Sequence, residues 1–246
     1  MDNRNYLLAN TISNNGINNP VLEFAYQGPK LKYIGENISI NVTGDVNFKI
    51  IRKNKNLEFS CYENIILENN DCLDILSTNR SVYGYLSIGG TFEVDYYLNS
   101  CSTNTKAKIG ANSGEKLKKG QIIHLKNIKK ILPKNKIEYL NSKIENIRII
   151  KGPHFDYFSK DAIDSFFSDE FNVTKLSDRM GIRLKGPKIS NIKNTNIKSE
   201  GLVKGVIQIT ADGDPIIMLS DHGTIGGYPK IGVVISADYD KLVQIP

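Results

Sequence analysis

Short stretches rich in Ile, Val, Leu and Tyr recur along the first 150 residues and are separated by Gly, Asn, Asp or Pro. Brief runs of β-branched and aromatic residues bounded by turn-forming residues are typical of β-strands. Strands at this close spacing favour a barrel or a sandwich. We predict strands at residues 21–26, 31–33, 38–42, 47–51, 81–88, 120–125 and 147–150.

A helical period is found in two places. Ser159 is a residue type that caps helix N-termini, and the apolar residues 162, 163, 166 and 167 that follow it share one helical face. Residues 5–13 have the second pattern and are compatible with the tail of a longer helix. A change of composition near residues 151–153 separates a basic, strand-rich part from an acidic helix and further strands. We therefore predict two halves, residues 1–145 and 146–246.

The positive charge is local. The net charge is +6, but residues 106–151 hold thirteen Lys or Arg against Glu115, Glu138 and Glu145, which gives +10 there and −4 elsewhere. Tyr139 is the only aromatic residue among the closely spaced lysines of 126–150, so the stretch lacks the aromatic platform on which bases stack. Solvated strand faces are the favoured interpretation of these lysines, and a surface for an anionic partner or ligand is the alternative. We expect no nucleic-acid partner.

The chain lacks several common functional signals. Residues 1–19 are rich in Asn and have no apolar core like that of a signal peptide, and no apolar run reaches the ~18 residues that a membrane-spanning helix needs. Three cysteines at wide spacing are expected to be reduced thiols, and the three histidines have no partner at metal-ligand spacing. We expect a soluble, cytoplasmic protein with no membrane partner and no metal.

Two common catalytic devices are also excluded. Residues 110–116 read GANSGEK, which lacks the spacing of a phosphate-binding Walker A loop and the hydroxyl residue after its lysine. Ser220, Asp221 and His222 have the residue types of a nucleophilic triad, but adjacent residues at a strand end point in different directions.

A dense C-terminal block is the most informative segment. Two apolar strands flank the turn at residues 211–215, and the second strand leads into Asp221 and a Gly-rich loop. One interpretation is a long hairpin whose glycines adopt positive φ angles. The other is a ligand-binding loop, in which Asp221 and Thr224 supply polar groups while Gly226 and Gly227 let the backbone approach closely.

At this block the sequence resembles the biotin-dependent carboxyltransferase family. Residues 177–187 are similar to the family's SDRMGYRLEGP, residues 199–209 to SEGVVPGAIQV, and residues 221–231 to DRQTTGGYPKI. Further similarities are Gly152-Pro153 with Asp156 and Phe158 to GPxxDxF, residues 84–90 to GYLAVAGG, and residues 22–29 to LEIxxxGP. The family includes the C subunit of bacterial 5-oxoprolinase, KipI antagonists, proteins labelled allophanate hydrolase subunit 2, and the carboxyltransferase domain of urea carboxylase.

The resemblance implies a fold and a function. The fold would be mainly β with a few short helices, in two β-barrel-like halves related to the cyclophilin-like fold. The chain would be the C subunit of an ATP-dependent 5-oxoprolinase, an enzyme complex that hydrolyses 5-oxoproline to glutamate together with its A and KipI-like B subunits. The alternatives are a non-catalytic antagonist of a KipI-like kinase inhibitor and a biotin-dependent carboxyltransferase acting on urea or a related amide. No cofactor would be covalently bound, ATP would be used by the complex, and biotin is a candidate ligand.

The resemblance also implies the site. Asp221 would orient the substrate amide and Arg179 would stabilise an anion or oxyanion, assisted by Gly226 and Gly227. Further substrate-binding candidates are Thr224, Tyr228, Lys230, Gln208 and Asn10. Structural roles are the alternative: an ion pair of Asp178 with Arg179, a packed turn at Tyr228, and a strand position for Gln208.

Three departures from the family pattern bear on activity. The family begins some twenty to thirty residues earlier, so we expect the first strand and its turn to be missing, which would leave an open sheet edge. The arginine of the family's SRST motif is Cys101 here. The arginine and glutamine of DRQTTGGYP are His222 and Gly223.

Overall fold

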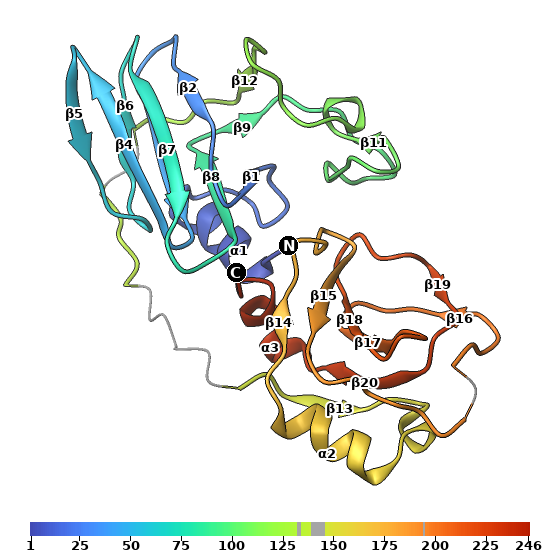
Figure 1. The fold of residues 1–246 in the computed structure, drawn as a ribbon. Helices are drawn as coiled ribbons and strands as arrows, with labels where there is room; N and C mark the ends of the chain where they lie inside the picture. Colours follow the sequence, from blue (N-terminus) through green and yellow to red (C-terminus); the bar gives the residue numbers. More distant parts are fainter. Residues whose placement is uncertain (132–133, 139–145, 194) are drawn as a thin grey trace. The chain divides into compact units, whose positions relative to one another are not determined.

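The computed structural model describes residues 1–131, 134–138, 146–193 and 195–246 (Figure 1). Contacts divide the chain into two compact units, residues 2–142 and residues 143–246 together with Met1. The division falls within 139–145, outside the described residues, so the predicted boundary between 145 and 146 stays a prediction.

The unit of residues 2–142 contains two four-stranded antiparallel sheets (Figure 1, blue to green). One has the order β1-β8-β3-β6 and the other β2-β7-β4-β5. The helix is α1 (Asn3–Ile12), the 3-10 turn is Asn112–Gly114, and the strands are β1 (Leu22–Ala25), β2 (Lys30–Lys32), β3 (Ile38–Thr43), β4 (Val46–Arg52), β5 (Lys55–Glu58), β6 (Ile65–Leu67), β7 (Cys72–Thr78), β8 (Tyr83–Ile88), β9 (Thr91–Phe92), β10 (Thr103–Asn104), β11 (Ile109–Gly110) and β12 (Leu125–Lys126).

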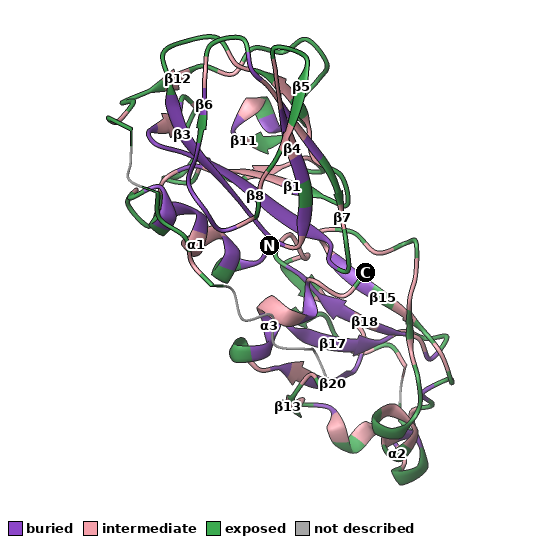
Figure 2. Cartoon of the chain, turned by 90° about the vertical axis from the view of Figure 1, so that its left-hand side faces the viewer, coloured by how far each residue is buried: buried purple, intermediate pink, exposed green. Residues whose placement is uncertain are grey.

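Strand β3 is buried on both faces, as its purple colour in Figure 2 shows. Its alternate residues Ile38, Ile40 and Val42 belong to the apolar core shared by the two sheets. The residues between them are polar: Asn41 donates to the carbonyl of Ala9 at 3.1 Å, and Thr43 donates to that of Asn5 at 2.9 Å. Buried hydrogen bonds therefore help to hold helix α1 against the sheet. They are consistent with the polar residues Asn5 and Asn10 on the buried side of the helix.

The start of α1 is fixed by a second buried polar group. Asp2 caps the helix by accepting from the backbone N–H of Asn5 at 2.9 Å. Tyr85 accepts from the backbone N–H of Asp2 at 2.7 Å and donates to Glu23 at 2.9 Å. Burial raises the pKa of the Tyr85 hydroxyl well above its usual value, so this hydroxyl remains a donor at any physiological pH.

The second unit is built on a six-stranded antiparallel sheet (Figure 1, yellow to red). Its order is β13-β20-β17-β18-β15-β14, and a separate pair joins β16 to β19. The helices are α2 (Lys160–Ser168) and α3 (Ser236–Leu242), the 3-10 turn is Phe155–Tyr157, and the strands are β13 (Ile149–Lys151), β14 (Asn172–Val173), β15 (Gly181–Lys185), β16 (Glu200–Gly201), β17 (Val206–Ile209), β18 (Pro215–Met218), β19 (Ile225–Gly226) and β20 (Lys230–Val234).

Most predicted elements are confirmed. The chain is mostly β with short helices, and Ser159 caps α2 by accepting from the backbone N–H of Ala162 at 3.2 Å. The strand predicted at 120–125 is wrong except at its last residue, because only Leu125 and Lys126 pair with β9 and Ile122 is exposed. The helix predicted at 5–13 begins at Asn3 and ends at Ile12.

An ion pair joins helix α3 to Arg148, the residue just before β13, and we expect this contact to be sensitive to acid. Asp238, whose side chain is 1% exposed, accepts from Arg148 Nε at 2.8 Å and from the Arg148 backbone N–H at 2.9 Å. These hydrogen bonds from Arg148 hold the pKa of Asp238 well below its usual range. Because the folded-state pKa is depressed, the pair stabilises the fold above the unfolded pKa of about 4, and this contribution is lost as the pH falls through the folded-state value.

We therefore expect Asp238→Asn to lower the melting temperature clearly at pH 7 and progressively less below about pH 4. Circular dichroism melts of both proteins across this range measure the difference. Asp164→Asn, at an exposed position on α2, is the matched control. A wild-type-to-variant difference that is constant with pH would contradict the assignment.

Candidate active site

The C-terminal block forms a hairpin followed by a long loop. Strands β17 and β18 pair antiparallel across the 210–214 turn, as the sequence predicts. The chain then leaves β18, pairs β19 with β16 through Gly226 and Glu200, and returns to the sheet at Lys230. The loop is therefore anchored at both ends and in its middle, which fixes the residues that the resemblance singles out.

The two predicted catalytic residues lie together. Arg179 donates from Nε to Asp221 Oδ2 at 2.8 Å and from Nη2 to Oδ1 at 3.4 Å. The backbone reinforces the pair, since the N–H of Asp221 donates to the carbonyl of Arg179 at 3.0 Å. Asp178 shapes the turn by accepting from the backbone N–H of Met180 at 2.8 Å. A fork of this kind combines charge with fixed geometry.

Tyr239 of α3 is a neighbour of this pair that sequence reasoning missed. Its hydroxyl lies 3.3 Å from Ser220 Oγ, next to Asp221, and Lys204 Nζ lies 4.3 Å from the ring centroid. Burial raises the pKa of Tyr239 to about 12. In the sequence, α3 is marked only by a short acidic segment after the last strand. Such a segment does not reveal where the helix packs.

A second polar cluster is built around Lys230. Its ammonium, 4% exposed, donates to Glu200 Oε2 at 2.8 Å. Glu200 Oε1 is 3.7 Å from His154 Nε2, and His154 Nδ1 accepts from the backbone N–H of Lys230 at 3.3 Å. The hydrogen bond from Lys230 lowers the pKa of Glu200. Glu200 and His154 were not among the predicted site residues.

Gln208 completes this cluster from the neighbouring strand. It is buried, lies directly opposite Lys230 in the sheet, and donates from Nε2 to the carbonyl of Tyr228 at 3.1 Å. A Cβ on Gly226 would lie 2.6 Å from Gln208 Nε2. A side chain at 226 would therefore displace the Gln208 amide, although the backbone at Gly226 has no positive φ angle.

The other predicted residues have separate positions. Thr224 is exposed, and its carbonyl accepts from the N–H of Leu202 at 3.0 Å. The carbonyl of Gly227 accepts from the N–H of Ile197 at 2.8 Å. Asn10 belongs to the unit of residues 2–142, where its amide donates to the carbonyl of Asn19 at 3.0 Å.

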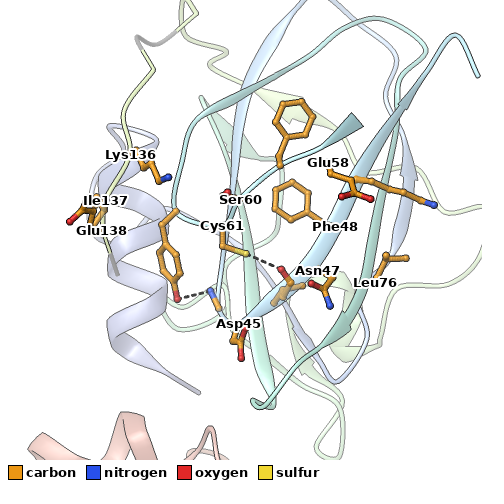
Figure 3. Close-up of a pocket in the computed structure, with 15 residues that line it drawn as sticks. Asp45, Asn47, Phe48, Glu58, Ser60, Cys61, Leu76, Lys136, Ile137 and Glu138 are labelled. Carbon is orange, nitrogen blue, oxygen red and sulfur yellow. Dashed lines mark hydrogen bonds between the residues drawn. The ribbon is translucent and has the colours of Figure 1, made fainter. Parts of the chain in front are cut away.

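A cavity of about 650 Å³ lies in the unit of residues 2–142, between β4, β5 and residues 136–138 (Figure 3). Cys61 lines it and donates from Sγ to the carbonyl of Val46 at 3.2 Å. Burial raises the pKa of Cys61 to about 11, so the thiol is a poor nucleophile at neutral pH. None of the predicted site residues lines this cavity.

Neither a metal site nor a membrane span is found in the part of the chain that the structure describes. No three His, Cys, Asp or Glu side chains within those residues are grouped to hold a metal ion. None of the helices there is long and apolar enough to cross a membrane.

The chain forms a mainly β protein of two units, with one polar cluster at each end of the loop that joins β18 to β20, at Asp221 and at Lys230. A family model for the carboxyltransferase domain, subdomain A and B, matches residues 1–246. The chain belongs to this carboxyltransferase family, which confirms the resemblance seen in the motifs.

Curated relatives fall into two groups. The chain is 33% identical to the 5-oxoprolinase C subunit of Escherichia coli over 178 residues, which cover 70% of this chain and 56% of that protein. It is 28% identical to urea amidolyase of Saccharomyces cerevisiae over 266 residues, covering 100% of this chain and 14% of that protein. The chain spans about half the length of the 5-oxoprolinase subunits that it matches.

The fold is found in solved structures as well. The Kluyveromyces lactis urea carboxylase aligns with a TM-score of 0.87 at 27% identity, over 100% of this chain and 24% of that chain. The mainly β architecture is therefore that of the carboxyltransferase-containing region of this neighbour.

Proposed function

We propose that this chain is the carboxyltransferase-type component of a cytoplasmic 5-oxoprolinase complex, acting with its A and KipI-like B subunits. The similarity to the E. coli 5-oxoprolinase C subunit supports this choice of substrate. The observation that carries the catalytic role is the Arg179–Asp221 pair at the base of the Gly-rich loop. Such a pair suits an amide, which presents a carbonyl oxygen and an N–H together.

The reaction breaks the lactam C–N bond. Water supplies a hydroxyl to the carbonyl carbon and a proton to the nitrogen, and ATP hydrolysis to ADP and phosphate drives the uphill step. A carboxylate has about four lone-pair sites, so Asp221 can orient a substrate N–H while it binds Arg179. The guanidinium of Arg179, fixed by Asp221, is a cation that stabilises negative charge developing on the carbonyl oxygen.

Co-expression with the A and B subunits tests this function. We expect a stable complex that releases glutamate from 5-oxoproline only when ATP is present. Omission of ATP, and omission of this chain, are the controls. A stable complex without turnover would contradict the enzymatic proposal and favour the non-catalytic antagonist of a KipI-like inhibitor.

A second candidate is carboxyl transfer from carboxybiotin to urea or a related amide. It is supported by the alignment of urea amidolyase to 100% of this chain. Biotin would supply a ureido group that carries the transferred carboxyl, and the Lys230–Gln208 cluster fits the ureido oxygen and N–H. Millimolar biotin should then raise the melting temperature through linkage, and an unchanged value would contradict this candidate.

A further inference from the structure

Tyr239 holds two exposed polar side chains in place near the Arg179–Asp221 pair. Tyr239 is 3% exposed, and its hydroxyl lies 3.3 Å from Ser220 Oγ. Lys204 Nζ lies 4.3 Å from the centroid of the same ring. Ser220 comes from the turn after β18 and Lys204 from the turn before β17, and both are exposed. One buried ring therefore fixes a hydroxyl and an ammonium at the surface.

The Ser220 hydroxyl keeps a proton that it can donate to a ligand. Burial raises the pKa of Tyr239 to about 12, so the phenol remains protonated at neutral pH. A buried hydroxyl nearly always has an acceptor, and within the described residues the Tyr239 hydroxyl has only Ser220 Oγ as a partner. Tyr239 therefore donates and Ser220 accepts. In the same part of the chain Ser220 Oγ has no second partner, so its own O–H is free to donate.

Lys204 adds a restrained cation. Its ammonium has no ion-pair partner among the residues that the structure describes. The electron-rich face of the Tyr239 ring attracts this ammonium and restrains a side chain that would otherwise be mobile. The charges of Asp240, Arg179 and Asp221 also act on the Tyr239 hydroxyl. Because Arg179 and Lys204 balance the two carboxylates, no net negative charge of this group opposes a bound anion.

The turn that contains Ser220 also contains Asp221. The two are the central residues of a turn that is closed by the His222 N–H, which donates to the carbonyl of Leu219 at 3.2 Å. Because they lie in a turn and not in a strand, their side chains are not forced onto opposite faces. The backbone N–H of Asp221 is fixed to Arg179 at 3.0 Å. Ser220 is thus held beside the carboxylate that, in the proposed function, orients the substrate N–H.

We propose that Ser220 and Lys204 form a carboxylate subsite next to the Arg179–Asp221 pair, with Tyr239 as its positioning residue. This inference rests on the proposed function and specifies which amides the site selects. In 5-oxoproline the carboxylate is attached to the carbon next to the ring nitrogen, so it lies on the N–H side of the amide. The carbonyl oxygen faces Arg179, the N–H faces Asp221, and the carboxylate accepts from Ser220 Oγ and Lys204 Nζ. Urea and simple amides have no group for this subsite.

The first test changes the ligand and leaves the protein unaltered. Calorimetric titration of the full chain compares 5-oxoproline with two neutral lactams, 5-oxoprolinamide and 2-pyrrolidinone. We expect both neutral lactams to bind at least about tenfold more weakly, because hydrogen bonds to a charged group are the stronger ones. The preference should decrease at high salt, since Lys204 is exposed. Equal affinities of 5-oxoproline and 2-pyrrolidinone would overturn the proposal.

The second test changes the protein. Lys204→Met and Ser220→Ala should each weaken 5-oxoproline about three- to tenfold and leave 2-pyrrolidinone unchanged. Lys185→Met, at an exposed ion pair with Asp214, is the control with unchanged binding of both ligands. Wild-type affinity for 5-oxoproline in folded Lys204→Met and Ser220→Ala proteins would contradict the subsite.

Tyr239→Phe tests the positioning role, because it removes the hydroxyl and keeps the ring beneath Lys204. We expect it to weaken 5-oxoproline but not 2-pyrrolidinone, and to add no further loss when combined with Ser220→Ala. A merely structural tyrosine would weaken both ligands alike, and that result would exclude the positioning role. If Tyr239→Phe fails to fold, the exposed positions Ser220 and Lys204 decide the proposal.

The subsite and the proposed function fail in different ways. If the complex hydrolyses 5-oxoproline and a folded double variant with Lys204→Met and Ser220→Ala has the KM of wild type, the subsite is wrong and the function stands. If the complex has no turnover but the full chain shows the ligand and variant pattern above, the function is wrong and the subsite stands. If 5-oxoproline does not bind the full chain, the inference is overturned.

Discussion

Arg179→Met is expected to lower kcat for ATP-dependent glutamate release by about 10²–10³-fold in the assembled complex. Arg179 is the group that faces developing negative charge, and loss of one oxyanion donor costs about this much in other enzymes. Asp221→Asn should have an effect of similar size, because the amide no longer anchors the guanidinium through two charge-assisted hydrogen bonds. Steady-state kinetics measure both.

A double variant with both Arg179→Met and Asp221→Asn tests whether the two residues act jointly or independently in catalysis. If Arg179 and Asp221 act as a unit, the double variant should be about as slow as the slower single variant, rather than the product of both losses. Arg183→Met, at an exposed position on β15, is the control and should retain wild-type kcat. Multiplicative losses, or full activity of a folded Arg179→Met complex, would exclude the joint catalytic role.

The pairing of these two residues could be predicted only in part. The motifs around 179 and 221 identified both positions, and the hairpin between β17 and β18 followed from its turn residues. The alternative that Arg179 serves an ion pair was also open, but with Asp178 as the partner. Asp178 accepts a backbone hydrogen bond within the turn, and the contact of Arg179 with Asp221 arises because the Arg179 turn lies beside the end of β18.

The site residues that the sequence did not predict were missed for one physical reason, which is that they reach the site from distant segments. Glu200 and His154 reach Lys230 from β16 and from the turn after β13, and Tyr239 reaches Ser220 from a helix of seven residues. Each contact joins segments 19 to 76 residues apart, so periodicity and spacing within one segment contain no trace of it. The strand predicted at 120–125 failed for a different reason. Its local pattern is strand-like, but only Leu125 and Lys126 have a partner strand to pair with.

Ile40→Ala is expected to destabilise the unit of residues 2–142 by about 2–5 kcal/mol. Ile40 is 1% exposed, lies in the apolar core between the two sheets, and is paired with Ile65 and Ile88. Its truncation removes buried methyl groups and leaves a cavity that the close-packed strands cannot fill. Ile66→Ala, on the neighbouring strand β6 but 39% exposed, is the matched control with a much smaller effect.

Differential scanning calorimetry should resolve this loss as a shift of one transition. If the two compact units unfold separately, Ile40→Ala lowers the transition of residues 2–142, whereas Ile207→Ala, in the core of the other sheet, lowers the second transition. A single transition that both variants shift equally would mean that the units unfold cooperatively. An Ile40→Ala protein as stable as Ile66→Ala would instead contradict the assignment of Ile40 to the core.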